Sequence, residues 1–105
     1  MTDTGHYNVT EIHITRMDGV AGGKPCIHGT RIRVRDVYIW HELQHLSADE
    51  IAREYRLSLA QVYAALTYAF EHLDEIRHDI QVSLDTVQSL KSQSESKLPD
   101  TLKNE

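Results

Sequence analysis

The sequence is poor in cysteine and contains no long apolar run. Its single cysteine, Cys26, cannot form a disulfide within the chain, so we expect a reducing compartment, the cytoplasm, and a small buried thiol. No apolar run approaches the roughly 20 residues that span a bilayer, so no membrane partner is expected. The first residues, MTDTGHYNVTEIH, have neither the basic start nor the apolar stretch of a secretory signal.

Cations are also scarce, because 11 Lys and Arg stand against 16 Asp and Glu and the net charge is −5 at pH 7. This balance argues against a protein that coats nucleic acid through its overall charge. The charges are nevertheless segregated. Residues 24–35 contain four cations and no acid, residues 57–70 carry no charge, and residues 71–85 contain five acids against Arg77. A basic N-terminal half and an acidic C-terminal half predict two surfaces with different partners.

The N-terminal part of the chain predicts a small β-hairpin. A length of 105 residues is sufficient for one domain, and residues 1–10 are expected to form a flexible arm. Ile12–Thr15 has apolar side chains at alternate positions, which predicts a short strand. Glycines and Pro25 then interrupt regular structure, and Cys26–Ile27 and Thr30–Val34 are β-like.

From Arg35 the apolar period becomes helical, which predicts a first helix from about Arg35 to Leu46. Ser47 and Glu50 form an S-x-x-E capping box, the start signal of a second helix that runs to about Tyr55.

A second capping box, formed by Ser58 and Gln61, starts a third helix, and only Arg56 and Leu57 separate it from the second. Two helices joined by so short a turn predict a helix-turn-helix. The buried stripe of the third helix is expected to consist of Leu59, Val62, Leu66, Ala69 and Phe70.

An amphipathic helix is expected over residues 73–90, with its apolar side chains near a 3.5-residue period. This seam is the expected contact with a partner protein, and it comprises Ile76, Ile80, Leu84, Val87 and Leu90. The alternative is that the helix docks on its own domain or on a twin subunit. Residues 91–105, KSQSESKLPDTLKNE, are polar and are expected to be disordered when alone.

The segment HELQH, His41 to His45, matches the zinc-protease pattern H-E-x-x-H, in which two imidazoles one helical turn apart bind zinc. Three short helices leave little room for a third ligand and a substrate groove. We therefore expect His41 and His45 to lie on a solvated helix face, with incidental metal binding and a zinc hydrolase as alternatives. No catalytic residue, metal or cofactor is expected.

A helix-turn-helix inserts the start of its second helix into the major groove of DNA. Among the groove-facing candidates, Gln61 could read adenine, although the capping box competes for its side chain. The expected base-facing residues are Ser58, Ala60, Gln61, Ala64, Thr67 and Tyr68. The expected phosphate contacts are Arg31, Arg33, Arg35, Arg53 and Arg56. The alternative is that these arginines pair with Asp36, Glu50 and Glu54 on an ordinary surface.

Three segments of the chain resemble a known bacterial family. Gly23–Ile32 reads GKPCIHGTRI and is followed by Val34–Val37, Ser47–Ile51 reads SADEI, and Leu59–Leu66 reads LAQVYAAL. They are similar to domain-of-unknown-function family 433, with its pattern G-K-P-x-I-x-G-T-R-I-x-V, then S-x-x-E-I, then V-x-A-A-L. The resemblance covers about Ile12 to Ile80.

The resemblance implies a mainly α fold. A three-helix, homeodomain-like helix-turn-helix would be preceded by the small β-hairpin. We expect this helix-turn-helix domain, hairpin included, over residues 11–72, followed by the C-terminal amphipathic helix. Members of the family are regarded as VapB-like antitoxins encoded beside a PIN-like ribonuclease toxin. The resemblance therefore implies a homodimeric antitoxin that neutralises such a toxin and represses its own operon by binding operator double-stranded DNA. The chain departs from the family at HELQH, where relatives more often have apolar and small residues.

Two further readings remain open from the sequence. The first is a protein-interaction module that does not bind DNA, and the second is the zinc hydrolase. The role of Gly29–Arg31, whether in the fold, the dimer or a partner contact, is also open.

Overall fold

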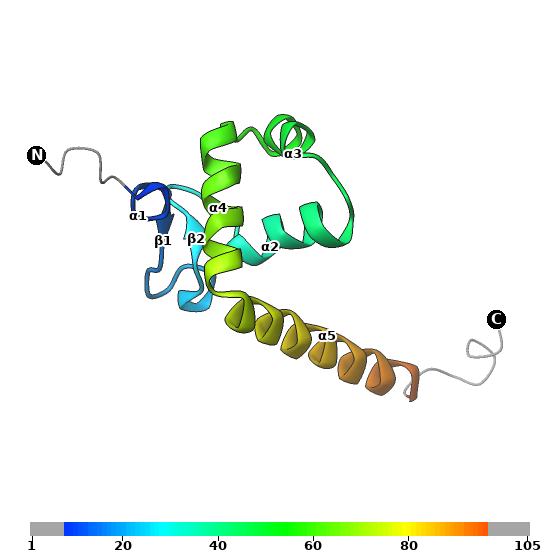
Figure 1. Cartoon of the computed structure of the whole chain (residues 1–105). Coiled ribbons are helices and arrows are strands. Elements are labelled where there is room, and N and C mark those ends of the chain that lie inside the picture. Colours follow the sequence, from blue (N-terminus) through cyan, green and yellow to red (C-terminus); the bar gives the residue numbers. More distant parts are fainter. Residues whose placement is uncertain (1–7, 97–105) are drawn as a thin grey trace, which may run out of the picture.

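A computed structural model describes residues 8–96 of the chain, which form a mainly helical domain with a small two-stranded antiparallel sheet (Figure 1). The elements are α1 (Val9–His13), β1 (Ile14–Thr15), the 3-10 turn η2 (Ala21–Gly23), β2 (Cys26–Ile27), α2 (Val34–Tyr38), the π-helix η3 (Ile39–Leu43), α3 (Ala48–Tyr55), α4 (Leu59–Glu71) and α5 (Leu73–Ser96). Within the described residues no helix is long and apolar enough to cross a membrane.

The expected β-hairpin is present but shorter than predicted. β1 pairs with β2 in antiparallel register, with Ile14 opposite Ile27 and Thr15 opposite Cys26. Cys26 is almost fully buried, as expected, and this burial raises the pKa of its thiol.

The chain turns back after β2 through a turn closed by Thr30. The Thr30 hydroxyl donates to the Ile27 carbonyl at 2.8 Å and accepts from the Ile32 amide at 3.0 Å. Gly29 has a φ of +79°, a left-handed value that costs glycine least. The Gly-Thr pair of the G-T-R-I segment therefore serves the fold, whereas the Arg31 side chain is exposed.

The start of the chain differs from the prediction, because Val9–His13 is a helix and only Ile14–Thr15 is a strand. Asn8 caps this helix, and its side-chain oxygen accepts from the Thr10 amide at 2.9 Å. The expected arm and strand were therefore wrong from residue 9 to residue 13. Residues 1–7 lie outside the described part.

The first predicted helix is confirmed in position, with a change of geometry along its length. α2 continues directly into η3, whose bonds include the Gln44 amide to the Ile39 carbonyl at 2.9 Å. Trp40 of η3 stacks on Tyr55 of α3, with ring centroids 3.7 Å apart, which joins η3 to α3. His45 has a φ of +63° and ends the segment.

Both predicted capping boxes are formed. The Ser47 hydroxyl accepts from the Glu50 amide and the Glu50 carboxylate accepts from the Ser47 amide. Ser58 and Gln61 make the same reciprocal pair at the start of α4. Arg56 ends α3 in the left-handed conformation, so α3 and α4 are joined by a turn as short as predicted.

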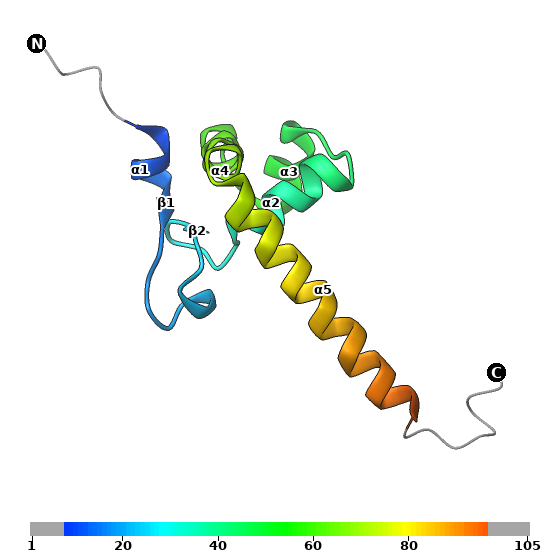
Figure 2. The same cartoon turned by 60° about the horizontal axis from the view of Figure 1, so that its bottom comes forward.

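The core surrounds α4, which contacts α1, α2, α3, α5 and both strands (Figure 2). The first half of α5 also contributes to this core, because Ile76 is buried in it and Leu73 and Ile80 pack against it. The buried cluster consists of Ile27, Val34, Val37, Tyr38, Ala48, Ile51, Leu57, Val62, Ala65, Leu66, Ala69 and Ile76.

α5 is the longest element and leaves the domain halfway along its length (Figures 1 and 2). Its first half packs on α2 and α4, and its second half projects into solvent. The helix continues to Ser96, so the boundary expected at residue 90 was too early. The expected tail from residue 97 to residue 105 lies outside the described residues.

Candidate interaction surfaces

The residues expected to read DNA do not share one open face of α4. Ala64 has no exposed surface. The prediction that Ala64 faces a groove was therefore wrong. The helix α1, which the sequence did not predict, packs on α4.

Two other predicted readers are held by bonds within the chain. The Gln61 side-chain oxygen accepts from the Ser58 amide at 2.7 Å, so the capping box does occupy it. The Tyr68 hydroxyl accepts from Arg16 Nη2 at 2.6 Å, and its ring stacks on His72 with centroids 4.0 Å apart. Thr67 and Ser58 are exposed.

Arg16 lies between α4 and α5. Its guanidinium donates to Tyr68 and also pairs with the Glu75 carboxylate. The hydrogen bond with Tyr68, and then that with Glu75, raise the pKa of Arg16 above its usual value. Arg16 thus joins the end of β1 to α4 through Tyr68 and to the start of α5 through Glu75.

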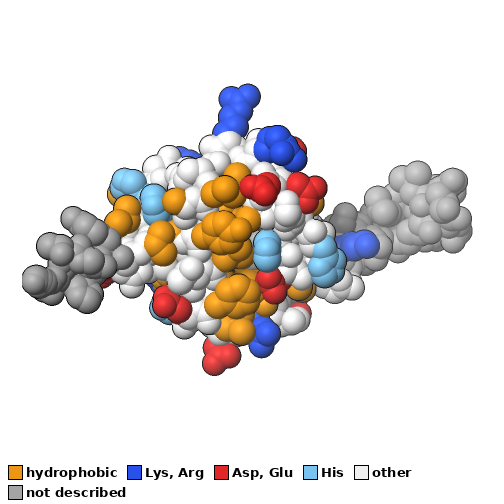
Figure 3. Space-filling model, turned by 45° about the horizontal axis from the view of Figure 1, so that its top comes forward, with side chains coloured by type: hydrophobic (Ala, Val, Ile, Leu, Met, Phe, Trp, Pro, Cys, Tyr) orange, Lys and Arg blue, Asp and Glu red, His pale blue; other side chains and the backbone are white. Residues whose placement is uncertain are grey.

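The open face of α4 is apolar. Leu59, Tyr63 and Phe70 are 44%, 54% and 51% exposed, and no charged residue lies between residues 57 and 70. Figure 3 shows hydrophobic side chains gathered down the middle of the face that carries α3 and α4. We call Leu59, Tyr63 and Phe70 the α4 stripe.

The prediction that Leu59 and Phe70 belong to the buried stripe was wrong, whereas Val62, Leu66 and Ala69 are buried as expected. Tyr63 was not predicted as a surface contact. The signal for it was present, because Leu59, Tyr63 and Phe70 recur at helical spacing beside the core positions.

The predicted phosphate contacts divide into free and bound cations. Arg31, Arg53 and Arg56 are exposed and make no ion pair within the described residues. Arg33 is half-buried at the start of α2, where its amide donates to Asp36.

Arg35 instead contacts two side chains of α5, Asp79 and Ser83. Its Nη1 lies 3.3 Å from Asp79 Oδ2 and also donates to the Ser83 hydroxyl. Lys24 Nζ lies 3.5 Å from the other oxygen of Asp79. The Asp79 and Arg35 side chains are only 13% and 18% exposed, so the prediction that Arg35 contacts phosphate was wrong.

The predicted partner seam is divided in the same way. Ile76 is buried in the core, so the prediction that it contacts a partner was wrong. Ile80 is partly buried against the core. Leu84, Val87 and Leu90 are 57%, 60% and 59% exposed. They continue the same helical face beyond the domain, and we call them the distal seam.

The HELQH histidines do not have the geometry of a zinc motif. His41 lies in η3, with Nδ1 2.6 Å from Glu42 Oε2, and His45 lies past the end of that helix with a left-handed backbone. The two imidazoles therefore do not project from successive turns of one α-helix. Among the described residues, no group of three or more His, Cys, Asp or Glu is placed to hold a metal ion.

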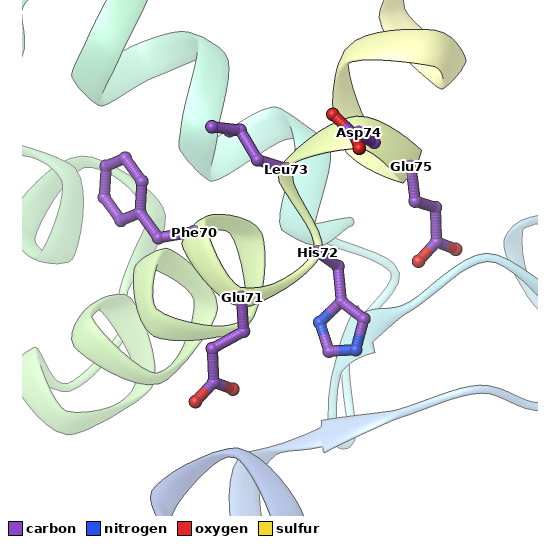
Figure 4. Close-up of a pocket in the computed structure, with 6 residues that line it drawn as sticks. All are labelled: Phe70, Glu71, His72, Leu73, Asp74 and Glu75. Atoms are coloured by element: carbon purple, nitrogen blue, oxygen red, sulfur yellow. The ribbon is translucent and has the colours of Figure 1, made fainter.

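An open hollow lies where α4 meets α5, lined by Phe70, Glu71, His72, Leu73, Asp74 and Glu75 (Figure 4). The side chains diverge, because Phe70 and Leu73 point away from Glu71, His72 and Glu75. Nothing in this arrangement converges on a ligand.

Comparisons with known proteins identify a family. The family model described as "Protein of unknown function (DUF433)" matches residues 14–69. The chain is also similar to the crystal structure of a DUF433 member from Anabaena variabilis, with 28% identity and a TM-score of 0.58. That match covers 65% of this chain and 67% of the other. No curated protein matches the chain.

Proposed function

The chain belongs to the DUF433 family, and we propose that it is a type II antitoxin that binds its partner protein through the distal half of α5. The partner expected from the family resemblance is a PIN-like ribonuclease. We assign no catalytic role to the chain and expect it in the cytoplasm.

The observation that carries the proposal is the distal seam. Leu84, Val87 and Leu90 project from a continuous helix whose first half is anchored in the domain. Because the helix is already formed, a partner that covers the seam would not have to order this segment from a random coil. An amphipathic helix laid into a hydrophobic groove is a common mode of protein recognition.

Growth rescue tests the proposal. The full chain is co-expressed with the PIN-like protein encoded beside it, and rescue is compared for the native chain and for Val87→Glu. We expect Val87→Glu to abolish rescue and to weaken the complex at least tenfold in calorimetry. Val82→Glu is the matched control, because Val82 is also exposed but lies on another side of α5. Equal rescue by both variants would contradict the proposal.

Operator binding is the second candidate, favoured by the short turn between α3 and α4 and by the free cations Arg53 and Arg56 beside it. A homeodomain-like helix-turn-helix would place these cations near DNA phosphates. It ranks second because α3 also carries Asp49, Glu50 and Glu54, and because the open face of α4 is apolar.

A gel shift on DNA upstream of the gene, at two salt concentrations, tests this candidate. We expect Arg53→Ala/Arg56→Ala to weaken a specific complex and to reduce its salt dependence. Gln61→Ala and Tyr68→Ala test base reading, since they should reduce specific binding more than binding to scrambled DNA. Lack of any shift by the native chain at low salt would eliminate the candidate.

A further inference from the structure

We propose that the hollow beside the turn after β2 binds an acidic peptide segment of a partner protein, whose carboxylate pairs with Arg31 while an adjacent apolar side chain enters the hollow. This inference does not depend on the distal seam or on the protein that binds there. It gives a role to a side chain that the fold does not use, because Arg31 is exposed.

The hollow lies between the segment after β1 and the turn after β2. It has a volume of about 350 Å³, is open to solvent and is lined by Thr15, Met17, Val20, Gly29, Thr30 and Arg31. Sites for small molecules enclose most of their ligand, which an open hollow does not do. A peptide that lies across the surface and inserts one side chain fits such a hollow better than a free molecule.

The walls of the hollow are mainly apolar. Met17 is 54% exposed and Val20 is partly exposed. A Cβ built on Gly29 would meet nothing within 4 Å, so the space beside this residue is unfilled. Methionine adapts its shape to what it contacts, and an apolar side chain inserted here would remove its exposed surface from water.

The turn after β2 carries hydrogen-bond donors that have no acceptor. Within residues 8–96, neither Gly29 nor Arg31 makes a hydrogen bond or an ion pair. Their two backbone amides and the Arg31 guanidinium are therefore available to a ligand. A carboxylate suits these donors, because its two oxygens can accept both arms of a guanidinium.

The charges around the hollow favour a ligand with a single negative charge. Of the cations in residues 24–35, Lys24 and Arg35 pair with Asp79. Arg31 contributes the cation that lines the hollow, and Asp18 in the loop after β1 is exposed. One cation between apolar walls matches one carboxylate with an apolar neighbour better than the repeated phosphates of DNA.

The small contact sets the expected affinity. One charge-assisted pair and one inserted side chain give a short peptide a dissociation constant of roughly millimolar order. Exchange of such a weak ligand is readily followed by the amide NMR signals of a chain of 12.0 kDa.

An NMR titration of the isotope-labelled full-length chain tests the proposal, with the peptide acetyl-GSLDLSG-amide as the probe. We expect saturable shifts of the Gly29 and Arg31 amides. The matched peptide acetyl-GSLNLSG-amide, which lacks the carboxylate, should bind about fivefold more weakly or less. Equal binding of the two peptides, no shifts with either, or shifts confined to the α4 stripe would overturn the proposal.

Variants test the two parts of the hollow. Arg31→Gln should weaken binding about fivefold or more, and Arg31→Lys should fall between it and the native chain, because lysine keeps the charge without the fork. Arg53→Gln, which removes an exposed cation on α3, should have no effect. Met17→Asp should abolish binding, whereas Ile12→Asp, at a similarly exposed position outside the hollow, should not. Unchanged binding in Arg31→Gln would refute the assignment.

Two further probes separate the peptide from other anionic ligands. Isocaproate carries the same carboxylate and an apolar chain as a free molecule, and we expect it to bind more weakly than the peptide. Tighter binding of isocaproate would make the hollow a small-molecule site and overturn the peptide assignment. A short DNA duplex that shifts the Arg31 amide more than the peptide does would assign the cation to phosphate instead.

Discussion

Individual polar side chains of this protein act mainly as local connectors. Thr30 bridges two backbone groups in the turn after β2, and Ser47, Glu50, Ser58 and Gln61 close the helix starts. Their effects are therefore predictable one residue at a time.

Thr30→Val is expected to destabilise the fold by about 1–2 kcal/mol, because it leaves the Ile32 amide without its acceptor and removes one of the two hydrogen bonds to the Ile27 carbonyl while keeping the side-chain shape. Urea unfolding measures the change. Arg31→Ala, at the next position, is the control and should stay within about 0.5 kcal/mol of the native chain, since its side chain is exposed. Equal losses would mean that the turn does not depend on the hydroxyl.

Glu50 is expected to make the stability of the domain pH-dependent. The hydrogen bond from the Ser47 amide lowers the pKa of Glu50 in the folded chain. Because the pKa of Glu50 is lower in the folded chain, its ionised carboxylate stabilises the folded domain at pH values above the unfolded-state pKa of about 4.3. This contribution is lost as the pH falls through the folded-state pKa. The melting temperature of Glu50→Gln should therefore lie below that of the native chain near neutral pH and approach it in acid.

The second capping box provides the control for this pH effect. Gln61 makes the same bond to Ser58 with an amide that does not titrate. Gln61→Ala should consequently lower the melting temperature by an amount that does not vary over the same pH range. A similar pH dependence in both variants would exclude Glu50 as its source.

At the scale of elements, ion pairs and apolar contacts fix the direction of α5 relative to the domain. Asp79 forms ion pairs with Lys24, in the loop before β2, and with Arg35 of α2. One turn earlier on α5, Ile76 is buried in the core. The face of α5 that is buried here is the face that becomes the distal seam further along.

Asp79→Asn is expected to destabilise the domain by about 1–2 kcal/mol, because it removes the carboxylate of Lys24 and leaves Arg35 with only the longer ion pair to Asp36, 4.0 Å from Nε, at a site only partly open to water. The loss should shrink in high salt, which screens the interaction. Asp85→Asn, further along the same helix, bonds only to Gln81 among the described contacts and should have little effect. Denaturant midpoints at low and high salt compare the two variants.

At the scale of the whole molecule, the projecting half of α5 makes the protein elongated. The radius of gyration is 17.9 Å, whereas a compact domain of this length would have about 13 Å. From Leu84 to Gln93 the side chains are exposed, so this part is expected to contribute little to the stability of the domain.

The free energy of unfolding of a chain that ends at Leu84 is expected to lie within about 0.5 kcal/mol of that of the full-length protein, because this chain retains Ile76, Asp79 and Ser83. It should lose the partner protein that the distal seam is proposed to bind. A chain that ends at Asp74 should be strongly destabilised, since it removes Ile76 from the core. Thermal unfolding compares the full-length protein with the two shortened chains. A large loss of stability in the chain that ends at Leu84 would show that the distal half of α5 supports the domain.

The sequence by itself determined the helical class, the small hairpin and the starts of α3 and α4. These features depend on contacts within a few residues, such as the reciprocal bonds between Ser47 and Glu50 or Ser58 and Gln61. Only the tertiary structure decided which faces stay open. Ala64 is fully buried, Arg35 pairs with Asp79 of α5, and Leu59 and Phe70 are exposed, because burial and pairing depend on segments far away in the sequence.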